Sequence, residues 1–200
     1  MIKNPALPNN YSSAQVGDCC KKEMILAKDH AIFSFLYGKY ALMITSLEPE
    51  NDLHLIFDLF EFNIEYPLVA IGNWNSSPYS QALYAKYHNH KMLHLIEPQL
   101  HSRTLNMLRS NCYVYIDAHH QVDDKNTLTE AMYLQLPVIA YASNYNKKLT
   151  EDKALYYKSV SHLLDAIKSL YPNKASENST FMKIIIDQKI QYQKQYSELV

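Results

Sequence analysis

The sequence has few glycines and few arginines. Its 200 residues contain only three glycines, and it has no glycine-rich dinucleotide fingerprint, no phosphate-cradling Gly-Lys-Ser/Thr loop and no nucleophile elbow. Arg103 and Arg109 are its two arginines, although planar, bidentate recognition of phosphate favours arginine. These absences exclude the nucleotide sites that depend on glycine-rich loops.

Cysteines and long apolar segments are also scarce. Cys19, Cys20 and Cys112 are odd in number, and two of them are adjacent, which is a poor basis for disulfides and favours the cytoplasm. The N-terminal segment is polar and carries prolines, unlike a signal peptide. The apolar stretches are far shorter than the ~20 residues that cross a bilayer. We expect a cytoplasmic protein whose membrane association is peripheral at most.

The charged residues give no sign of a polyanionic partner. The formal net charge is -1, and no basic cluster of the kind found in nucleic-acid-binding proteins is present. The nine histidines suggest a metal site, but the members of each close pair, 88/90 and 119/120, are adjacent or nearly adjacent in the sequence. Adjacent residues rarely ligate one ion with good geometry, so we expect no metal. Cys112 borders a buried strand and is expected to be an inert core thiol.

Short apolar runs alternate with stretches of helical periodicity along most of the chain. The runs typical of buried strands are 40–45, 66–72, 92–96, 113–116, 137–141 and 154–157. Helices are predicted over 53–60, 77–88, 100–110, 128–134, 160–170 and 181–199. The alternation predicts an α/β fold, a Rossmann-like parallel sheet of about six strands with helices on both faces. We expect a flexible lead-in over 1–22, this domain over 23–172 and a C-terminal helical extension over 173–200.

In such a sheet the segments that follow the strands all lie at one edge, where ligands bind. These segments are polar and comprise 46–51, 72–77, 97–98 and 117–126. The last precedes a helix with Glu130 in its first turn. A carboxylate there could accept two hydrogen bonds from a ribose diol, beside a helix N-terminus suited to a diphosphate. The alternative is a capping box in which Thr127 caps the helix and Glu130 completes the box.

Several segments in one order resemble a known family. The strand followed by Leu47-Glu48-Pro49-Glu50-Asn51, the segment 69–75, and the glutamate helix and strand over 130–140 carry the likeness, and 144–154 continues it. Together they resemble the C-terminal, nucleotide-sugar-binding domain of GT-B glycosyltransferases, most closely the bacterial rhamnosyltransferase-like group. The likeness extends from about Ile25, where 25–31 resembles the end of an interdomain connection, to the end of the sequence.

The resemblance implies a site for a nucleotide diphosphate sugar as the donor, with no cofactor and no metal. Glu130 would hold the ribose. The donor phosphates or sugar would lie near the loop of Gly72 and Asn73, and the nucleobase near Ile96. Residues 117–127 would cover the sugar and the diphosphate, and they include His119, Lys125, Asn126 and Thr127.

This sequence departs from the family at several of these positions. Ser46 and Asn51 stand where the family usually has an arginine and often a lysine, and Val122 where the broader family has the first of two glutamates. The family's glycine-rich loop is replaced by Val122-Asp123-Asp124. Cations at these positions normally offset the diphosphate charge.

The resemblance implies transfer of a hexosyl or rhamnosyl unit onto a bacterial surface glycan, as in polysaccharide biosynthesis. A GT-B enzyme closes two domains over its substrates, and 200 residues suffice for one. We therefore expect this chain alone to be inactive and to need a separate N-terminal GT-B domain polypeptide as partner, or to be a remnant of a longer gene. The alternative is a catalytically inactive interaction module with the same fold.

Overall fold

The computed structural model describes residues 20–62, 64–121 and 127–197, and within them the chain forms one parallel sheet. Its strands are β1 (Ala41–Ile44), β2 (Leu68–Ile71), β3 (Leu93–Ile96), β4 (Val114–Asp117), β5 (Val138–Tyr141) and β6 (Leu155–Tyr157). Their order is β3-β2-β1-β4-β5-β6, and every neighbouring pair is parallel. This confirms the predicted Rossmann-like fold of about six strands.

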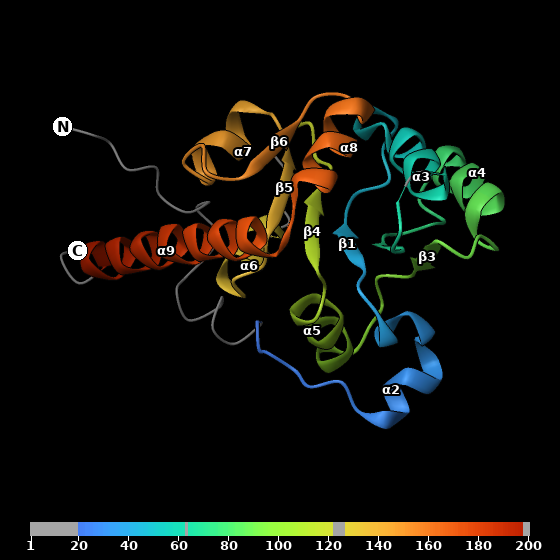
Figure 1. Cartoon of the computed structure of the whole chain (residues 1–200), viewed down its shortest axis with the longest axis horizontal. Helices are drawn as coiled ribbons and strands as arrows, with labels where there is room; N and C mark the ends of the chain where they lie inside the picture. Colours follow the sequence, from blue (N-terminus) through green and yellow to red (C-terminus); the bar gives the residue numbers. More distant parts are fainter. Residues whose placement is uncertain (1–19, 63, 122–126, 198–200) are drawn as a thin grey trace.

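Helices cover both faces of the sheet (Figure 1). In chain order they are α2 (Ala27–Ile32), α3 (Leu53–Phe62), α4 (Pro78–Tyr87), α5 (Ser102–Ser110), α6 (Thr127–Tyr133), α7 (Asn144–Leu149), α8 (Val160–Ser169) and α9 (Pro172–Ser197). Two short 3₁₀ helices, η1 (Ser34–Tyr37) and η2 (Pro49–Asn51), flank β1.

The alternation of side chains along each strand separates two hydrophobic cores. Ala41 and Met43 of β1 face the core formed with α3, α4 and α8, while Leu42 faces the core formed with α5, α6 and α9. Because successive side chains of a strand point to opposite faces, an uninterrupted apolar run supplies both cores at once. The short apolar runs of the sequence are therefore strands buried on both sides.

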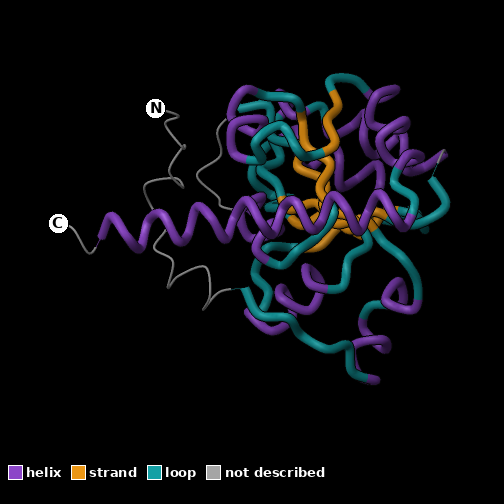
Figure 2. Tube along the Cα trace, turned by 60° about the vertical axis from the view of Figure 1, so that its left-hand side comes forward, coloured by secondary structure: helices purple, strands orange, loops and turns teal. Residues whose placement is uncertain are grey.

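Helix α9 is longer than the predicted helix over 181–199, because it begins at Pro172. Its first turns are polar, but Asn178 is buried and its Oδ1 accepts the Val138 N–H at 2.7 Å. A tertiary hydrogen bond, which the hydrophobic pattern does not reveal, therefore anchors this part of the helix. Figures 1 and 2 show α9 crossing the sheet and continuing beyond it.

Two helices were not predicted. Residues 25–31 resembled an interdomain connection, yet α2 forms there and is held by Asp29, whose Oδ2 accepts the Leu26 N–H at 2.8 Å. Helix α7 forms after β5 because the Ser143 side chain caps it and accepts the Asn146 N–H. The predicted lead-in over 1–22 lies mostly outside the described residues, and the proposed domain limits remain predictions.

Candidate functional site

The strand order reverses at one point of the sheet, between β1 and β4. After β1 the chain builds β2 and β3 on one side, and it then returns to place β4 on the other side of β1. The main-chain segments after these two strands diverge, and doubly wound proteins bind their ligands outside the carboxyl ends at such a switch point. We call this end of the strands the carboxyl edge and the opposite end the amino edge.

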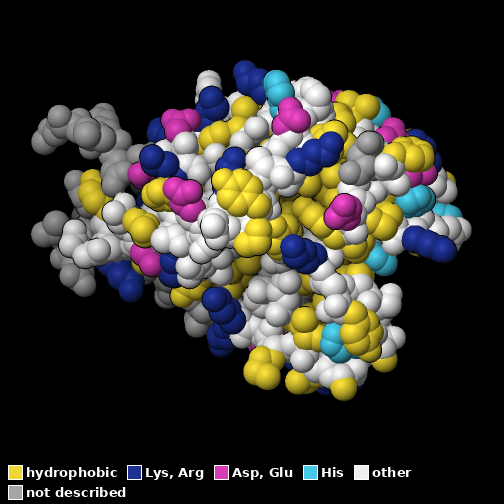
Figure 3. Space-filling view, in the orientation of Figure 1, with side chains coloured by type: hydrophobic (Ala, Val, Ile, Leu, Met, Phe, Trp, Pro, Cys, Tyr) yellow, Lys and Arg dark blue, Asp and Glu magenta, His cyan; other side chains and the backbone are white. Residues whose placement is uncertain are grey.

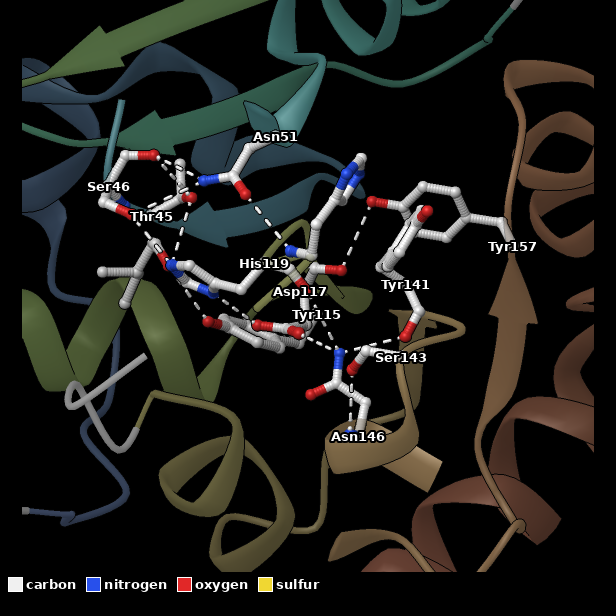
Figure 4. Close-up of polar contacts among 12 residues, drawn as sticks. Thr45, Ser46, Asn51, Tyr115, Asp117, His119, Tyr141, Ser143, Asn146 and Tyr157 are labelled. Atoms are coloured by element: carbon white, nitrogen blue, oxygen red, sulfur yellow. Dashed lines mark hydrogen bonds and ion pairs between the residues drawn. The ribbon is translucent and has the colours of Figure 1, made fainter. Parts of the chain in front are cut away.

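A buried carboxylate–imidazole pair lies at the end of β4 (Figure 4). Asp117 Oδ1 is 2.8 Å from His119 Nδ1, and the two side chains are only 3% and 6% exposed. His119 Nε2 lies 3.3 Å from Thr45 Oγ1 and accepts the Ser46 backbone N–H at 3.4 Å. A ring nitrogen that accepts an N–H bond carries no proton, so this pattern corresponds to a neutral imidazole that donates from Nδ1 to Asp117.

Asn51 joins the two segments that diverge at the switch point. Its Nδ2 donates to the Ser46 carbonyl at 3.1 Å, and its Oδ1 accepts the His120 backbone N–H at 3.1 Å. The side chain is buried. Ser46, Asn51 and His119, three residues predicted for the donor site, are therefore brought together, and Asn51 holds the loop after β1 to the loop after β4.

The strand β5 and the residues after it complete this network. Asn146 of α7 donates from Nδ2 to Asp117 Oδ2 at 2.7 Å and to the Tyr141 carbonyl at 3.0 Å. The Tyr157 hydroxyl donates to the Asp117 carbonyl at 3.3 Å. Burial, together with the negative charge of Asp117, raises the pKa of Tyr157, which keeps the phenol neutral at physiological pH.

His120 lies at the surface side of the same network. Its ring stacks on Tyr141 with centroids 3.5 Å apart. Burial lowers the pKa of His120, with Asp52 and Asp117 opposing the shift, so this imidazole is neutral near pH 7. The network thus offers neutral hydrogen-bonding groups and a flat aromatic pair, together with the buried carboxylate of Asp117.

Glu130 lies in the first turn of α6 and forms a buried ion pair. Its Oε2 is 2.6 Å from Arg109 Nη2, and the side chains are 14% and 3% exposed for Glu130 and Arg109 respectively. Arg109 Nη1 also lies 3.9 Å from Cys20 Sγ. The carboxylate predicted to hold a ribose therefore already has a cationic partner from α5.

The loop after β2 is shaped by packing against the loop after β1. A Cβ added to Gly72 would lie 2.8 Å from Leu47 Cγ and Cδ2, closer than non-bonded carbons approach. Gly72 has a negative φ, so the close leucine, and no special backbone angle, requires the glycine. The Asn73 side chain accepts the Asn75 N–H and stabilises its own turn.

Ile96 ends β3 and is only partly buried. Its carbonyl accepts the Trp74 indole N–H at 3.0 Å and the Gly72 N–H at 3.1 Å. Trp74 itself is buried and contacts the rings of Phe57 and Tyr84. Trp74 is therefore a core residue between α3 and α4, and it fixes the backbone around Ile96 instead of offering a stacking surface.

The remaining predicted site residues adjoin the start of α6. Thr127 is buried and is the first residue of the helix, while Lys125 and Asn126 lie outside the described residues. Within 20–62, 64–121 and 127–197, no group of three or more His, Cys, Asp and Glu residues is placed to hold a metal ion. In the same residues no helix is long and apolar enough to cross a membrane.

Among the pockets of the described residues, two lie away from the switch point. One of about 410 Å³ runs along β3 and η1, and one of about 530 Å³ lies beside η1 and the residues that precede β2 and β4. The second is thus at the amino edge. We favour the switch point as the candidate site because polar side chains from the segments that follow β1, β4 and β5 converge there, whereas neither pocket contains a comparable buried network.

Thr45 and Asn146 were not among the predicted donor-site residues, and Asp117 was included only as the first residue of the segment 117–127. Asp117 carried a signal, since an acidic residue that ends an apolar strand is unlike the buried residues before it. Thr45 and Asn146 carried none, because their importance comes from contacts with residues 74 and 29 positions away.

Comparison with known proteins identifies this architecture. No family model and no curated protein matches the sequence. Among solved structures, HepE from Anabaena, in complex with UDP-glucose, superposes with a TM-score of 0.71 at 12% identity, over 96% of this chain and 56% of HepE. The C-terminal domain of a group 1 glycosyl transferase from Francisella tularensis superposes with a TM-score of 0.63 at 13% identity, over 90% of this chain and 98% of that domain. The chain has the fold of a GT-B half-domain.

A third neighbour agrees with this assignment. Sucrose-phosphate synthase from Thermosynechococcus elongatus matches with a TM-score of 0.67 at 16% identity, over 91% of this chain and 50% of the enzyme. The chain spans about half the length of such full-length neighbours, including the trehalose-6-phosphate synthase OtsA, of which it covers 48%. At identities this low the superpositions establish the fold alone, and a fold does not determine the activity.

Proposed function

We propose that this chain is the nucleotide-sugar-binding half of a glycosyltransferase and that the donor binds at the carboxyl edge of β1 and β4. The observation that carries the proposal is the convergence of Ser46, Asn51 and His119 at the switch point. The same fold in HepE is known in complex with UDP-glucose. Ligands of doubly wound sheets bind at this position.

Within this proposal, Glu130 accepts hydrogen bonds from the ribose while Arg109 fixes its carboxylate at Oε2. Ser46 and the loop of residues 117–127 lie against the diphosphate and the sugar. By the family resemblance, the transferred unit is a hexosyl or rhamnosyl group and the acceptor a bacterial surface glycan.

The proposal includes a partner domain. Ser46 and Asn51 supply no positive charge, and a leaving diphosphate is stabilised by cations and oriented dipoles. We therefore propose that an N-terminal GT-B domain, on this or another polypeptide, provides the acceptor site and the missing charge when the two domains close.

Isothermal titration calorimetry with UDP-, GDP- and dTDP-sugars tests donor binding. We expect one nucleotide class to bind, and Ser46→Arg to tighten it on the order of ten-fold, since a charge-assisted hydrogen bond contributes about 1.5–3 kcal/mol. Ser46→Asp should weaken binding by like-charge repulsion. The matched control is Ser176→Arg, an equal change at an exposed position of α9.

If the folded protein gives no heat of binding with any of the nucleotide sugars, the proposal is rejected and an interaction module is favoured. Equal effects of Ser46→Arg and Ser176→Arg would reject the location of the site while leaving nucleotide binding intact.

A further inference from the structure

Exposed hydrophobic side chains gather around α2. Of the eleven large hydrophobic side chains exposed among the described residues, four lie between positions 24 and 37. They are Met24, Leu26, Ile32 and Tyr37, with 77%, 42%, 71% and 78% of their surface exposed. Figure 3 shows hydrophobic side chains along the lower rim of the molecule, where Figure 1 places α2. Scattered exposed hydrophobics are normal, but a concentration of this kind marks an interaction surface.

The helix itself presents its apolar side to solvent. Ala27, Ala31 and Ile32 are exposed and lie on one face at helical spacing, with the exposed Lys28 beside them. The opposite face carries Asp29, which is buried. A surface helix normally buries its apolar stripe, so the amphipathicity of α2 is reversed with respect to the protein core.

Lysines surround this apolar face. Lys21, Lys22 and Lys28 are exposed, and no ion pair engages them within the described part of the chain. Among the described residues 20–37, the acidic residues are Glu23, which is half-buried, and Asp29, which is buried. We call Lys21, Lys22, Met24, Leu26, Lys28, Ile32 and Tyr37 the α2 patch.

Arg103 already neutralises the negative charge of Asp29. Arg103 Nη1 and Nη2 donate to Asp29 Oδ1 and Oδ2 at 3.0 and 2.9 Å. Three lysines against Glu23 then leave a charge of +2 on the patch, in a chain whose formal net charge is -1. The patch is therefore apolar at its centre and positive at its margin.

We propose that the α2 patch binds the surface of a bilayer that contains anionic lipids. Met24, Leu26 and Ile32 would enter the boundary between headgroups and acyl chains, with the lysine side chains reaching the lipid phosphates. Tyr37 suits the same interface, since its ring is apolar and its hydroxyl polar. The ring of His30 stacks on that of Tyr37, with the two centroids 4.0 Å apart.

The charge distinguishes this partner from a second copy of the chain. A two-fold symmetric contact would bring the lysines of one patch against those of the other, and like charges placed face to face oppose association. A bilayer with anionic lipids offers acyl chains to the apolar centre and phosphates to the positive margin.

The position of the patch leaves the candidate site open. In Figure 1 the arrows of β1 and β4 point away from α2, which lies toward the amino edge. A bilayer bound at α2 would therefore not cover the switch point at the carboxyl edge. The proposal is independent of donor binding.

Co-sedimentation with vesicles tests the proposal. The full chain should pellet with vesicles of phosphatidylcholine containing about one third phosphatidylglycerol and stay in the supernatant with phosphatidylcholine alone, and salt should weaken binding. A lysine near an anionic surface contributes about 1 kcal/mol, or roughly five-fold. The triple variant K21E/K22E/K28E should therefore lower the partition coefficient roughly 100-fold or more.

Matched controls separate the patch from general effects. Ile32→Ser should weaken binding on the order of ten-fold through lost apolar contact, whereas Phe62→Ser, also at an exposed residue, should not. Lys158→Glu changes an exposed lysine outside the patch and should have a small effect.

Three results would overturn the inference. These are no binding of the wild-type chain to anionic vesicles, binding that the triple variant retains in full, and a dimer in solution that Ile32→Ser abolishes while vesicle binding is absent. The last would assign the patch to a second copy. None of them bears on nucleotide calorimetry, so the two proposals fail separately.

Discussion

Replacing Glu130 by alanine leaves the Arg109 guanidinium buried without its carboxylate. Arg109 is 3% exposed, its Nη2 lies 2.6 Å from Glu130 Oε2, and its Nε has no hydrogen-bond partner among the described residues. Removing one member of a buried pair costs about 3–5 kcal/mol, because the remaining charge is desolvated and unpaired. The partial exposure of Glu130 favours the lower value, about 3 kcal/mol.

The double variant Arg109→Met/Glu130→Leu removes the whole ion pair, whereas Glu130→Ala removes only one of its two charges. Apolar residues of similar size remove both charges, and such replacements are often neutral or stabilising. We expect the free energy of unfolding of the double variant to lie within about 1 kcal/mol of the wild-type value, which would show that the two sites are strongly coupled.

Urea unfolding followed by tryptophan fluorescence measures these differences. Trp74 is the single tryptophan and is buried, so its emission reports loss of the core. The control is Asp187→Ala, which breaks the Lys183–Asp187 pair. That pair has the same 2.6 Å distance, but its side chains are 33% and 52% exposed, and an exposed helical pair contributes only about 0.3–0.5 kcal/mol.

An Asp187→Ala cost as large as that of Glu130→Ala would contradict the reasoning from burial. A cost below about 1 kcal/mol for Glu130→Ala would mean that the carboxylate is solvated and that its ion pair with Arg109 contributes little to the stability of the fold.

Three further predictions concern other parts of the fold. Gly72→Ala should cost about 1–3 kcal/mol in urea unfolding, because its methyl group would overlap a packed leucine. Gly38→Ala, whose added Cβ meets no atom within 4 Å, should be neutral or slightly stabilising, and an equal loss in both variants would refute this argument. Hydrogen bonds from Arg103 lower the pKa of Asp29 from 3.8 to about 2. The unfolded chain therefore binds more protons between these values, and the stability from Asp29, full above pH 4, is lost as the pH falls toward 2. Melting temperatures of Asp29→Asn and wild type should accordingly converge as the pH is lowered, and a constant gap would count against the pair. Burial raises the pKa of Cys112 to about 12, so iodoacetamide at pH 8 should label it only after unfolding, as measured by peptide mass spectrometry.

The sequence alone was sufficient for the strands and for the edge at which polar groups meet. The runs 40–45 and 113–116 are too short and too apolar for anything but strands buried on both faces, and helices between them force parallel pairing. Parallel strands end at one edge, so the convergence of Ser46, Asn51 and His119 was implied by connectivity. The helix α2 was not predicted from the segment 25–31. Its apolar residues face the solvent, so the segment lacks the pattern of a helix that packs on a core.

Only the tertiary structure decided which side chains are partners. Glu130 was predicted to face a ligand, and its pairing with Arg109 depends on how α5 packs beside α6. The loop of Gly72 was predicted to lie near the donor phosphates or sugar, which stays a prediction, and only the structure shows that Leu47 packs against this glycine. Local periodicity determines which residues are buried, because it follows from backbone geometry. The identity of each contact depends on strand order and on interlocking side chains from distant parts of the chain, which no local pattern encodes.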